Sequence, residues 1–336
     1  MPQPLSHRAK LCVLGAGAWG TALAIQAARA GNAVALWARD PARAAAIAKA
    51  RENARHLPGA RLSAAVAVTG DLGAALDGAA LAIVAVPAQH MRAVLERLPP
   101  AASAGLPLVI GAKGVEQGTL KLPLEVAAEA RPEAPGAVLS GPNFAHEVAA
   151  GLPAAAVVAS RDAALRKRAG DLLGSPGFRL YGGDDPMGVQ VGGAAKNVIA
   201  IAAGAVIGAG LGENARAALV TRGLAELSRL TVALGGRQET AAGLSGLGDL
   251  LLTTTGPGSR NTSLGVELGH GRSLEEALAG RVGVAEGVAT APAIVARAAQ
   301  VGVELPICAA VADLLAGELT VGDAMGRLLA RPRRDE

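Results

Sequence analysis

Lys196 and Asn197 stand directly before a run at residues 198–211 that is apolar and rich in glycine and alanine. A segment of this composition favours burial, which leaves two interpretations of the lysine. Its ammonium could reach water from the end of a helix, as long basic side chains often do. Alternatively the amine is desolvated, which lowers its pKa and suits it to proton transfer at a reacting oxygen. The rest of the chain must decide between the two.

Two later segments carry groups that would complement a buried amine. Asp249 lies among glycine and apolar residues, and Ser259, Arg260 and Asn261 offer a hydroxyl, a guanidinium and an amide on consecutive residues. The planar fork of arginine suits bidentate binding of phosphate or carboxylate. Ser259 is equally suited to capping a helix whose first turn contains a solvated Arg260. On these residues alone, the helix cap is slightly favoured over the anion site.

Gly15, Gly17 and Gly20 form the spacing GxGxxG between an apolar run at 11–14 and a segment of helical composition at 21–30. In that context the three glycines allow a tight turn, a close approach of the backbone to a pyrophosphate, and packing of the helix on the strand. The free amides at the helix start then hold the phosphate charge. A simple turn is the alternative in a chain with 45 glycines. The flanking elements favour dinucleotide binding.

An acidic residue at the end of the second strand normally binds the ribose 2′-hydroxyl of NAD. Here the second apolar run, at 33–37, ends in Trp37-Ala38-Arg39-Asp40. Arg39 is suited to a 2′-phosphate, so we predict that NADP is accepted at least as well as NAD, with NADPH favoured. The alternative is an exposed loop arginine without a ligand.

Ligands of open α/β sheets bind beyond the carboxyl ends of the strands, so the loops after later strands are informative. Lys113 follows the fifth apolar run and is flanked by Gly111 and Gly114, which crowd it little. It could therefore reach an anionic or carbonyl substrate. A solvated loop lysine is the alternative. The loop at 140–147 follows the sixth run and includes Asn143.

The spacing of apolar residues divides the chain into two halves. Up to Asp185 the apolar runs are short and continuous, which predicts a sheet buried on both faces and a doubly wound α/β domain. After Pro186 the spacing becomes helical. We therefore predict a Rossmann-like dinucleotide-binding domain at 1–185 and an all-α domain at 186–336. The expected strands are 11–14, 33–37, 65–68, 81–86, 108–110, 137–139, 154–159 and 178–181, and the expected later helices are 198–209, 215–234, 274–278, 291–301 and 307–315.

Composition excludes several classes of protein. A net charge of +4 and an aromatic content of 1% provide neither a basic stripe nor stacking platforms for nucleic acid. The five histidines lack metal-ligand spacing, and Cys12 and Cys308 fit neither a disulfide framework nor a zinc site. The longest uncharged run, 198–212, is shorter than the roughly 20 residues of a membrane-spanning helix. We expect a cytoplasmic protein without a metal site, a nucleic-acid partner or a transmembrane segment.

Taken in order, the motifs resemble those of the bacterial-type NAD(P)-dependent glycerol-3-phosphate dehydrogenase family. The resemblance spans nearly the whole chain, and several of its segments are specific. They are GAGAWGTALA at 15–24, WAR at 37–39, NARHLPG at 53–59, AKGVE at 112–116, LSGPNFAHEV at 139–148, GGAAKNVIAIAAG at 192–204, GLSGLGDLLLT at 243–253, SRN at 259–261 and VAEGV at 284–288.

The resemblance implies roles at the matching positions, with Lys196, Asp249 and Lys113 as the catalytic set. Ala18 stands where the family usually has Ser, His56 where Tyr is frequent, and Asn143 where Ser or Thr is frequent, which weakens individual contacts. The implied cofactor residues are Gly15, Gly17, Ala18, Trp19, Gly20, Arg39, His56, Lys113, Ala145, Arg260, Val284 and Glu286. The implied substrate residues are Lys113, Gly141, Asn143, Lys196, Asp249, Ser259, Arg260 and Asn261.

The implied reaction is reversible hydride transfer that interconverts dihydroxyacetone phosphate and sn-glycerol 3-phosphate and feeds glycerophospholipid synthesis. Lys196 would give or take the proton, and Asp249 would raise the lysine pKa against the effect of burial. A β-hydroxyacid or 6-phosphogluconate dehydrogenase shares the two-domain plan, including the helical domain, and remains the alternative enzyme. A redox-sensing dinucleotide-binding regulator is the alternative outside enzymes. The helical domain could also support a homodimer.

Overall fold

The computed structural model describes residues 8–256 and 258–331, which form two compact units. The first contains the chain up to Ala112 together with Pro123–Pro186, and the second contains Lys113–Leu122 together with the chain from Met187 onward. This division differs from the expected 1–185 and 186–336 in residues 113–122 and, at the boundary itself, in Pro186. Residues 113–122 belong to the helical unit because Val115 and Leu122 are buried in its core.

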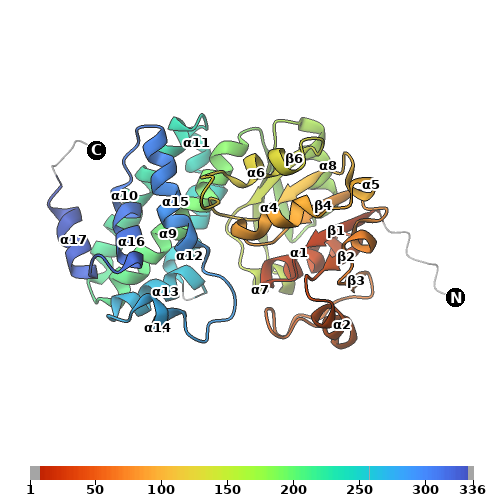
Figure 1. The fold of residues 1–336 in the computed structure, drawn as a ribbon, viewed down its shortest axis with the longest axis horizontal. Helices are drawn as coiled ribbons and strands as arrows, with labels where there is room; N and C mark the ends of the chain where they lie inside the picture. Colours follow the sequence, from red (N-terminus) through yellow and green to blue (C-terminus); the bar gives the residue numbers. More distant parts are fainter. Residues whose placement is uncertain (1–7, 257, 332–336) are drawn as a thin grey trace. The chain divides into compact units, whose positions relative to one another are not determined.

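The first unit is built on one eight-stranded sheet (Figure 1). Its spatial order is β3-β2-β1-β4-β5-β6-β7-β8, and neighbouring strands run parallel except at the β6–β7 pair, which is antiparallel. All eight expected strands are present. They are β1 (Lys10–Leu14), β2 (Ala33–Trp37), β3 (Val66–Thr69), β4 (Leu81–Val84), β5 (Leu108–Ile110), β6 (Gly136–Ser140), β7 (Ala154–Ala159) and β8 (Phe178–Gly183).

Helices cover both faces of this sheet, which explains why its strands are continuously apolar. Leu11 and Val13 of β1 pack in a core with α1 and α8, whereas Cys12 and Leu14 pack in a second core with α4 and α6. Successive side chains of a strand point to opposite faces, so a strand covered twice alternates between two cores. The helices are α1 (Ala18–Arg29), α2 (Pro41–Ala50), α3 (Leu72–Leu76), α4 (Ala88–Glu96), α5 (Pro100–Ser103), α6 (Pro123–Ala130), α7 (Ala145–Ala150) and α8 (Ala163–Leu173).

The second unit is helical over the part of the chain that the structure describes, and α9 (Pro186–Gly208) is its central element. Residues 188–206 of α9 are all buried. The other elements pack around it (Figure 1). They are α10 (Gly212–Ala233), α11 (Gln238–Ala241), a π-helical turn η1 (Leu244–Gly248), α12 (Asp249–Thr255), α13 (Arg260–Gly269), α14 (Leu274–Leu278), α15 (Glu286–Gln300), α16 (Pro306–Ala316) and α17 (Val321–Leu329).

Backbone contact between α9 and α13 explains the glycine content of the central run. A Cβ on Gly204 would lie 2.1 Å from the carbonyl oxygen of Thr262, and one on Gly265 would lie 2.0 Å from that of Ile201. Both positions therefore require glycine. The two helices cross at a distance that any side chain would increase, which fixes the start of α13 relative to the middle of α9.

Two sequence expectations about α9 are corrected by its length. Lys196 is in the middle of a 23-residue helix and not at its head, because the helix begins at Pro186. By length and composition α9 could cross a membrane, in contrast to the shorter run counted in the sequence, but 83% of its most apolar window is buried inside the unit. This is the environment of a core helix.

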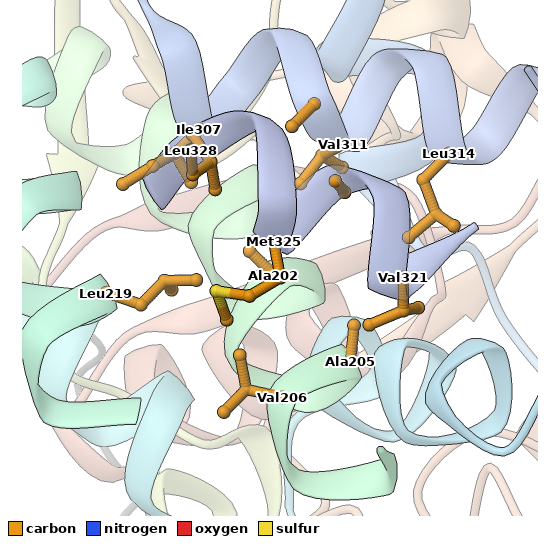
Figure 2. Close-up of a pocket in the computed structure, with 12 residues that line it drawn as sticks. Ala202, Ala205, Val206, Leu219, Ile307, Val311, Leu314, Val321, Met325 and Leu328 are labelled. Atoms are coloured by element: carbon orange, nitrogen blue, oxygen red, sulfur yellow. The ribbon is translucent and has the colours of Figure 1, made fainter. Parts of the chain in front are cut away.

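The C-terminal helices leave an apolar cleft against α9, shown in Figure 2. Met325 and Leu328 of α17 line the cleft together with Ala202 and Val206 of α9, and α10 and α16 complete the lining. All twelve lining residues are Ala, Val, Leu, Ile or Met. Such a surface gives no partner to a phosphate or a carbonyl oxygen, so the polar chemistry of the protein is elsewhere.

Candidate active site

Three charged side chains meet inside the helical unit. The Asp249 carboxylate is 2% exposed, and each of its oxygens takes one ammonium: Lys196 Nζ lies 3.0 Å from Oδ1 and Lys113 Nζ lies 2.5 Å from Oδ2. The side chains of Lys196 and Lys113 are 11% and 17% exposed. The cluster therefore carries two positive charges and one negative charge in a largely desolvated place. The solvated-lysine interpretations of Lys196 and Lys113 are both wrong.

The local fold holds each member of this cluster. Gly192, one turn before Lys196 on α9, packs so closely on η1 that a Cβ would lie 2.7 Å from the Ser245 carbonyl oxygen. Asp249 is the first residue of α12, directly after η1. Lys113 begins the segment whose buried Val115 anchors it in the helical core. The glycines of α9 thus set the distance between the lysine and the carboxylate.

Thr253 is a further member that the sequence reasoning missed. Lys196 Nζ donates a hydrogen bond to Thr253 Oγ1 over 2.9 Å, and the same hydroxyl donates to the backbone carbonyl of Asp249 over 2.6 Å. Because that donation uses the hydroxyl proton, the oxygen presents a lone pair to the lysine. The available signal was spacing: Asp249 and Thr253 are four residues apart on a helix and share one face.

Electrostatics make Lys196 the group that can exchange a proton near neutral pH. Burial lowers the pKa of Lys196 to about 8; Asp249 opposes this shift, whereas Lys113 and then Arg260 add to it. Burial by itself raises the pKa of Asp249, but the ammoniums of Lys113 and Lys196 outweigh burial and hold that pKa below its usual range. Asp249 therefore stays ionised while Lys196 is poised between its two forms.

An amide network connects α9 to two neighbouring helices. Asn261 Nδ2 donates to Asn197 Oδ1 over 2.9 Å, and the Gly287 backbone N–H donates to Asn261 Oδ1 over 3.1 Å. The network ties α9, α13 and the start of α15 together. Asn261, expected at the substrate, is therefore also held by protein contacts. The orientation of its amide is fixed by Asn197, which is adjacent to Lys196 in the chain, and by Gly287.

Ser259 and Arg260 are placed as the helix-cap interpretation predicts. The Ser259 hydroxyl accepts a hydrogen bond from the Thr262 backbone N–H over 3.2 Å, and Arg260 is the exposed first residue of α13. Arg281, in the loop between α14 and α15, holds that loop against α13 by donating to the Ser263 hydroxyl over 2.7 Å and to the Ser263 carbonyl over 3.0 Å. In the same loop a Cβ on Gly283 would lie 2.5 Å from an Arg260 Nη. The guanidinium thus rests beside a loop that also contains Val284 and leads to Glu286.

The first unit builds the glycine turn at the carboxyl end of β1. Gly15 has φ +109°, and a Cβ on Gly20 would lie only 1.8 Å from the Gly15 carbonyl oxygen, so turn and helix close on each other. Gly17 caps α1 without a side-chain hydrogen bond and has open space beside it. Ala18 follows as the first helical residue. Free amides at a helix start with room for a ligand fit the pyrophosphate of a dinucleotide.

Trp19 supports the same fit. Among the residues that the structure describes, its indole Nε1 is buried and has no hydrogen-bond partner. It lies close enough to the strand β5 end that a Cβ on Gly111 would be 3.0 Å from it. A buried donor without a partner is costly, and a polar ligand at the carboxyl end of the sheet would satisfy it. The residues present therefore fit a bound dinucleotide.

The remaining candidates of this unit lie on its loops. Arg39 is exposed two residues after β2, half-buried His56 lies in the 53–59 segment, and Ala145 begins α7. Asn143 donates to the Ala155 carbonyl over 3.1 Å, while its Oδ1 is buried and, within the described ranges, unpaired. Gly141, at φ +154°, allows that loop to pass the backbone of β7 closely. The site candidates thus fall into two groups, each organised within its own unit.

Comparison with known proteins agrees with this division. The family model described as the NAD-dependent glycerol-3-phosphate dehydrogenase N-terminus matches residues 10–166, and the one described as its C-terminus matches 185–326. The chain belongs to the NAD-dependent glycerol-3-phosphate dehydrogenase family. It is 56% identical to a glycerol-3-phosphate dehydrogenase (NAD(P)+) of Caulobacter vibrioides over 80% of this chain and 81% of the relative. A counterpart from Parvibaculum lavamentivorans is 53% identical over 82% of each chain.

Solved structures of the glycerol-3-phosphate dehydrogenase family share the fold. The crystal structure of the Coxiella burnetii enzyme superposes with a TM-score of 0.93 at 38% identity, covering 98% of this chain and all of that one. The resemblance to the family and the expected fold class, a Rossmann-like domain followed by a helical domain, are therefore confirmed. The individual site roles remain assignments for this chain.

Proposed function

We propose that this protein catalyses the reversible reduction of dihydroxyacetone phosphate to sn-glycerol 3-phosphate with NADPH or NADH. The buried Lys113–Asp249–Lys196 cluster carries the proposal. When bound, the nicotinamide supplies the hydride in reduction and accepts it in oxidation. The relatives named as glycerol-3-phosphate dehydrogenases indicate the substrate. In reduction, one hydride reaches substrate C2 and one proton reaches its oxygen, so the protein must provide an acid.

Lys196 is that acid. Its Nζ is oriented by Asp249 Oδ1 and Thr253 Oγ1, which leaves its third proton for the oxygen that develops charge at C2. With a pKa of about 8 it is mostly protonated at neutral pH and yet weakly enough basic to give the proton up. In oxidation the neutral amine takes the proton back. Reprotonation from solvent completes the cycle in reduction.

Lys113 and Arg260 are proposed to bind the substrate. Lys113, paired with the other oxygen of Asp249, is a second cationic side chain in the cluster and would stabilise the developing oxyanion. Arg260, close enough to lower the pKa of Lys196, is proposed to hold the phosphate with the help of Asn261. A contact at the phosphate is remote from the reacting carbon and uses binding energy to orient it.

Oxidation of NADPH, followed by its absorbance, tests this function. We expect NADPH to be oxidised with dihydroxyacetone phosphate. We expect no reduction of NADP+ with 6-phosphogluconate or with β-hydroxyacids. Turnover only with the latter compounds would assign the sibling activity, and no turnover with tight NADPH binding would favour a regulator. Lys196→Ala should lose a hundredfold to ten-thousandfold in rate, roughly the worth of a general acid, while NADPH binding stays intact. Near-normal turnover in this variant would remove Lys196 from the mechanism.

A further inference from the structure

Two segments of the first unit converge on one backbone atom of the glycine turn. The carbonyl oxygen of Ala16 accepts a hydrogen bond from an Arg43 Nη and another, over 2.9 Å, from the buried Asn53 Nδ2. Asn53 also donates to Thr21 Oγ1 over 2.8 Å, which ties the 53–59 segment to the first turn of α1. The start of α2 and the segment that contains Arg55 are thereby held beside the phosphate-binding turn.

The charges that meet there are unbalanced. Burial, followed by the nearby positive charge of Arg55, lowers the pKa of Arg43, and Asp40 opposes them. Like charges repel, so holding Arg43 and Arg55 together is unfavourable unless an anion lies between them. Arg39 lies two residues after Trp37, whose carbonyl accepts a hydrogen bond from the Gly15 backbone N–H over 3.1 Å, so the backbone from which this exposed third arginine extends is next to the turn.

The neighbouring carboxylates are already engaged. Asp40 Oδ1 accepts hydrogen bonds from the backbone N–H groups of Ala42 and Arg43, at 2.9 and 3.4 Å, and so caps α2. Glu52 accepts from the Gly59 backbone N–H over 2.9 Å and lies 3.9 Å from Arg61. The Asp40 carboxylate offsets one of the three arginine charges. The remaining net charge of about two positive units matches a phosphate dianion.

We propose that Arg43 and Arg55, together with Arg39, bind the 2′-phosphate of NADP and determine the preference of this protein for NADP over NAD. The inference rests on the NAD(P) dependence of the proposed function and adds two residues to it. Arg43 has a double role, since one Nη braces the Ala16 carbonyl and the rest of the guanidinium faces the phosphate. Its Nε, buried and without a partner within the described chain, is a donor that a phosphate oxygen would satisfy.

Binding of nucleotides, measured by calorimetry on the full-length protein without substrate, tests the proposal independently of turnover. Adenosine 2′,5′-bisphosphate and adenosine 5′-monophosphate differ only in the 2′-phosphate, as NADPH and NADH do. We expect Arg55→Ala to weaken the bisphosphate and NADPH about tenfold to a hundredfold, the usual worth of a charge-assisted hydrogen bond. The affinities for the monophosphate and NADH should change less than about twofold. Arg61→Ala removes an exposed arginine six residues after Arg55; it is the matched control and should change none of the four affinities.

Arg43→Ala extends the test to the braced arginine. It should lower the affinity for NADPH more than that for NADH. The affinity for NADH should also fall somewhat, because the glycine turn loses the hydrogen bond from Arg43 to the Ala16 carbonyl. Equal weakening of all four nucleotides in Arg43→Ala and Arg55→Ala would show a structural brace and overturn the proposal. An unchanged ratio of NADPH to NADH affinity in Arg55→Ala would also overturn it, even if Arg43→Ala does not fold. Neither outcome would touch the reduction of dihydroxyacetone phosphate, which is measured separately.

Discussion

Removing the charge of Asp249 should move the pH dependence of reduction to lower pH. With the Lys196 pKa at about 8, about nine in ten lysines are ammonium at pH 7, so the reduction rate should be high below pH 8 and fall above it. Asp249→Asn removes the principal interaction that raises this pKa, leaving burial and Lys113 to lower it. At 3.0 Å and an effective dielectric of 20, the lost attraction is about 5.5 kcal/mol.

That attraction is an upper bound, because water and small rearrangements recover part of it, but about 1.4 kcal/mol suffices for one pH unit. We therefore expect the alkaline limb of the reduction rate to move down by at least about one pH unit. In oxidation, which needs the neutral amine, the acid limb should move down equally. Both limbs move in the same direction because the loss of the Asp249 charge favours the neutral amine form of Lys196 over the ammonium form.

Single-turnover measurements of NADPH absorbance between pH 5.5 and 9.5, at constant ionic strength, would separate the chemical step from product release. NADPH affinity measured at each pH excludes a binding effect. The control is Glu226→Gln, which removes the charge of another buried carboxylate. That carboxylate accepts hydrogen bonds from the backbone N–H groups of Ile307 and Cys308 and has no contact with Lys196 among those the structure describes. Its limb should coincide with that of the wild type. An alkaline limb in Asp249→Asn that stays in place or moves upward would mean that Lys196 is not the titrating acid.

Three further predictions concern single contacts. Arg260→Ala should lower kcat/KM for dihydroxyacetone phosphate at least about tenfold and reduce its discrimination against dihydroxyacetone; unchanged discrimination would transfer the phosphate role elsewhere. Thr253→Val should lower kcat about tenfold through the lost hydrogen bond to Lys196, with Thr253→Ser restoring it and substrate KM little changed; a loss confined to KM would contradict this role. Gly20→Ala should destabilise the fold, because its Cβ would lie 1.8 Å from a carbonyl oxygen, whereas Gly17→Ala should keep a normal Tm and lose NADPH affinity. Equal Tm values for the two glycine variants would refute the steric argument.

The sheet was predictable because burial on both faces leaves a direct mark on the sequence. Each strand is a short continuous apolar run, as β1 shows by sending Leu11 and Cys12 into different cores. The direction of β7 was not predictable, since an apolar run reads the same whether the strand pairs parallel or antiparallel with β6. The start of α9 was placed too late for a related reason. Gly188 and Gly192 resemble helix breakers in sequence, but Gly192 is a packing position against η1.

The geometry of the candidate site was not predictable from the sequence. The resemblance implied Lys113, Lys196 and Asp249, but no spacing in the sequence shows that the two lysines share one carboxylate. Thr253 was missed because threonine at the end of an apolar helix is ordinary, and only the position of Lys196 Nζ gives it meaning. Segment 113–122 was assigned to the wrong half because it follows a sheet strand, whereas the burial of its apolar residues decides where it packs.

Both groups of candidate site residues carry more positive than negative charge. In the helical unit Asp249 neutralises only one of two ammoniums, and in the first unit Asp40 is used to cap α2 beside three arginines. Buried or clustered cations without counter-ions are unfavourable in the free protein. In the proposed reaction the helical cluster faces the oxygen that develops negative charge at C2, and the arginines of the first unit face the 2′-phosphate of NADP. We therefore expect each excess of positive charge to lie where a ligand carries or develops negative charge, so that binding relieves repulsion between the cations.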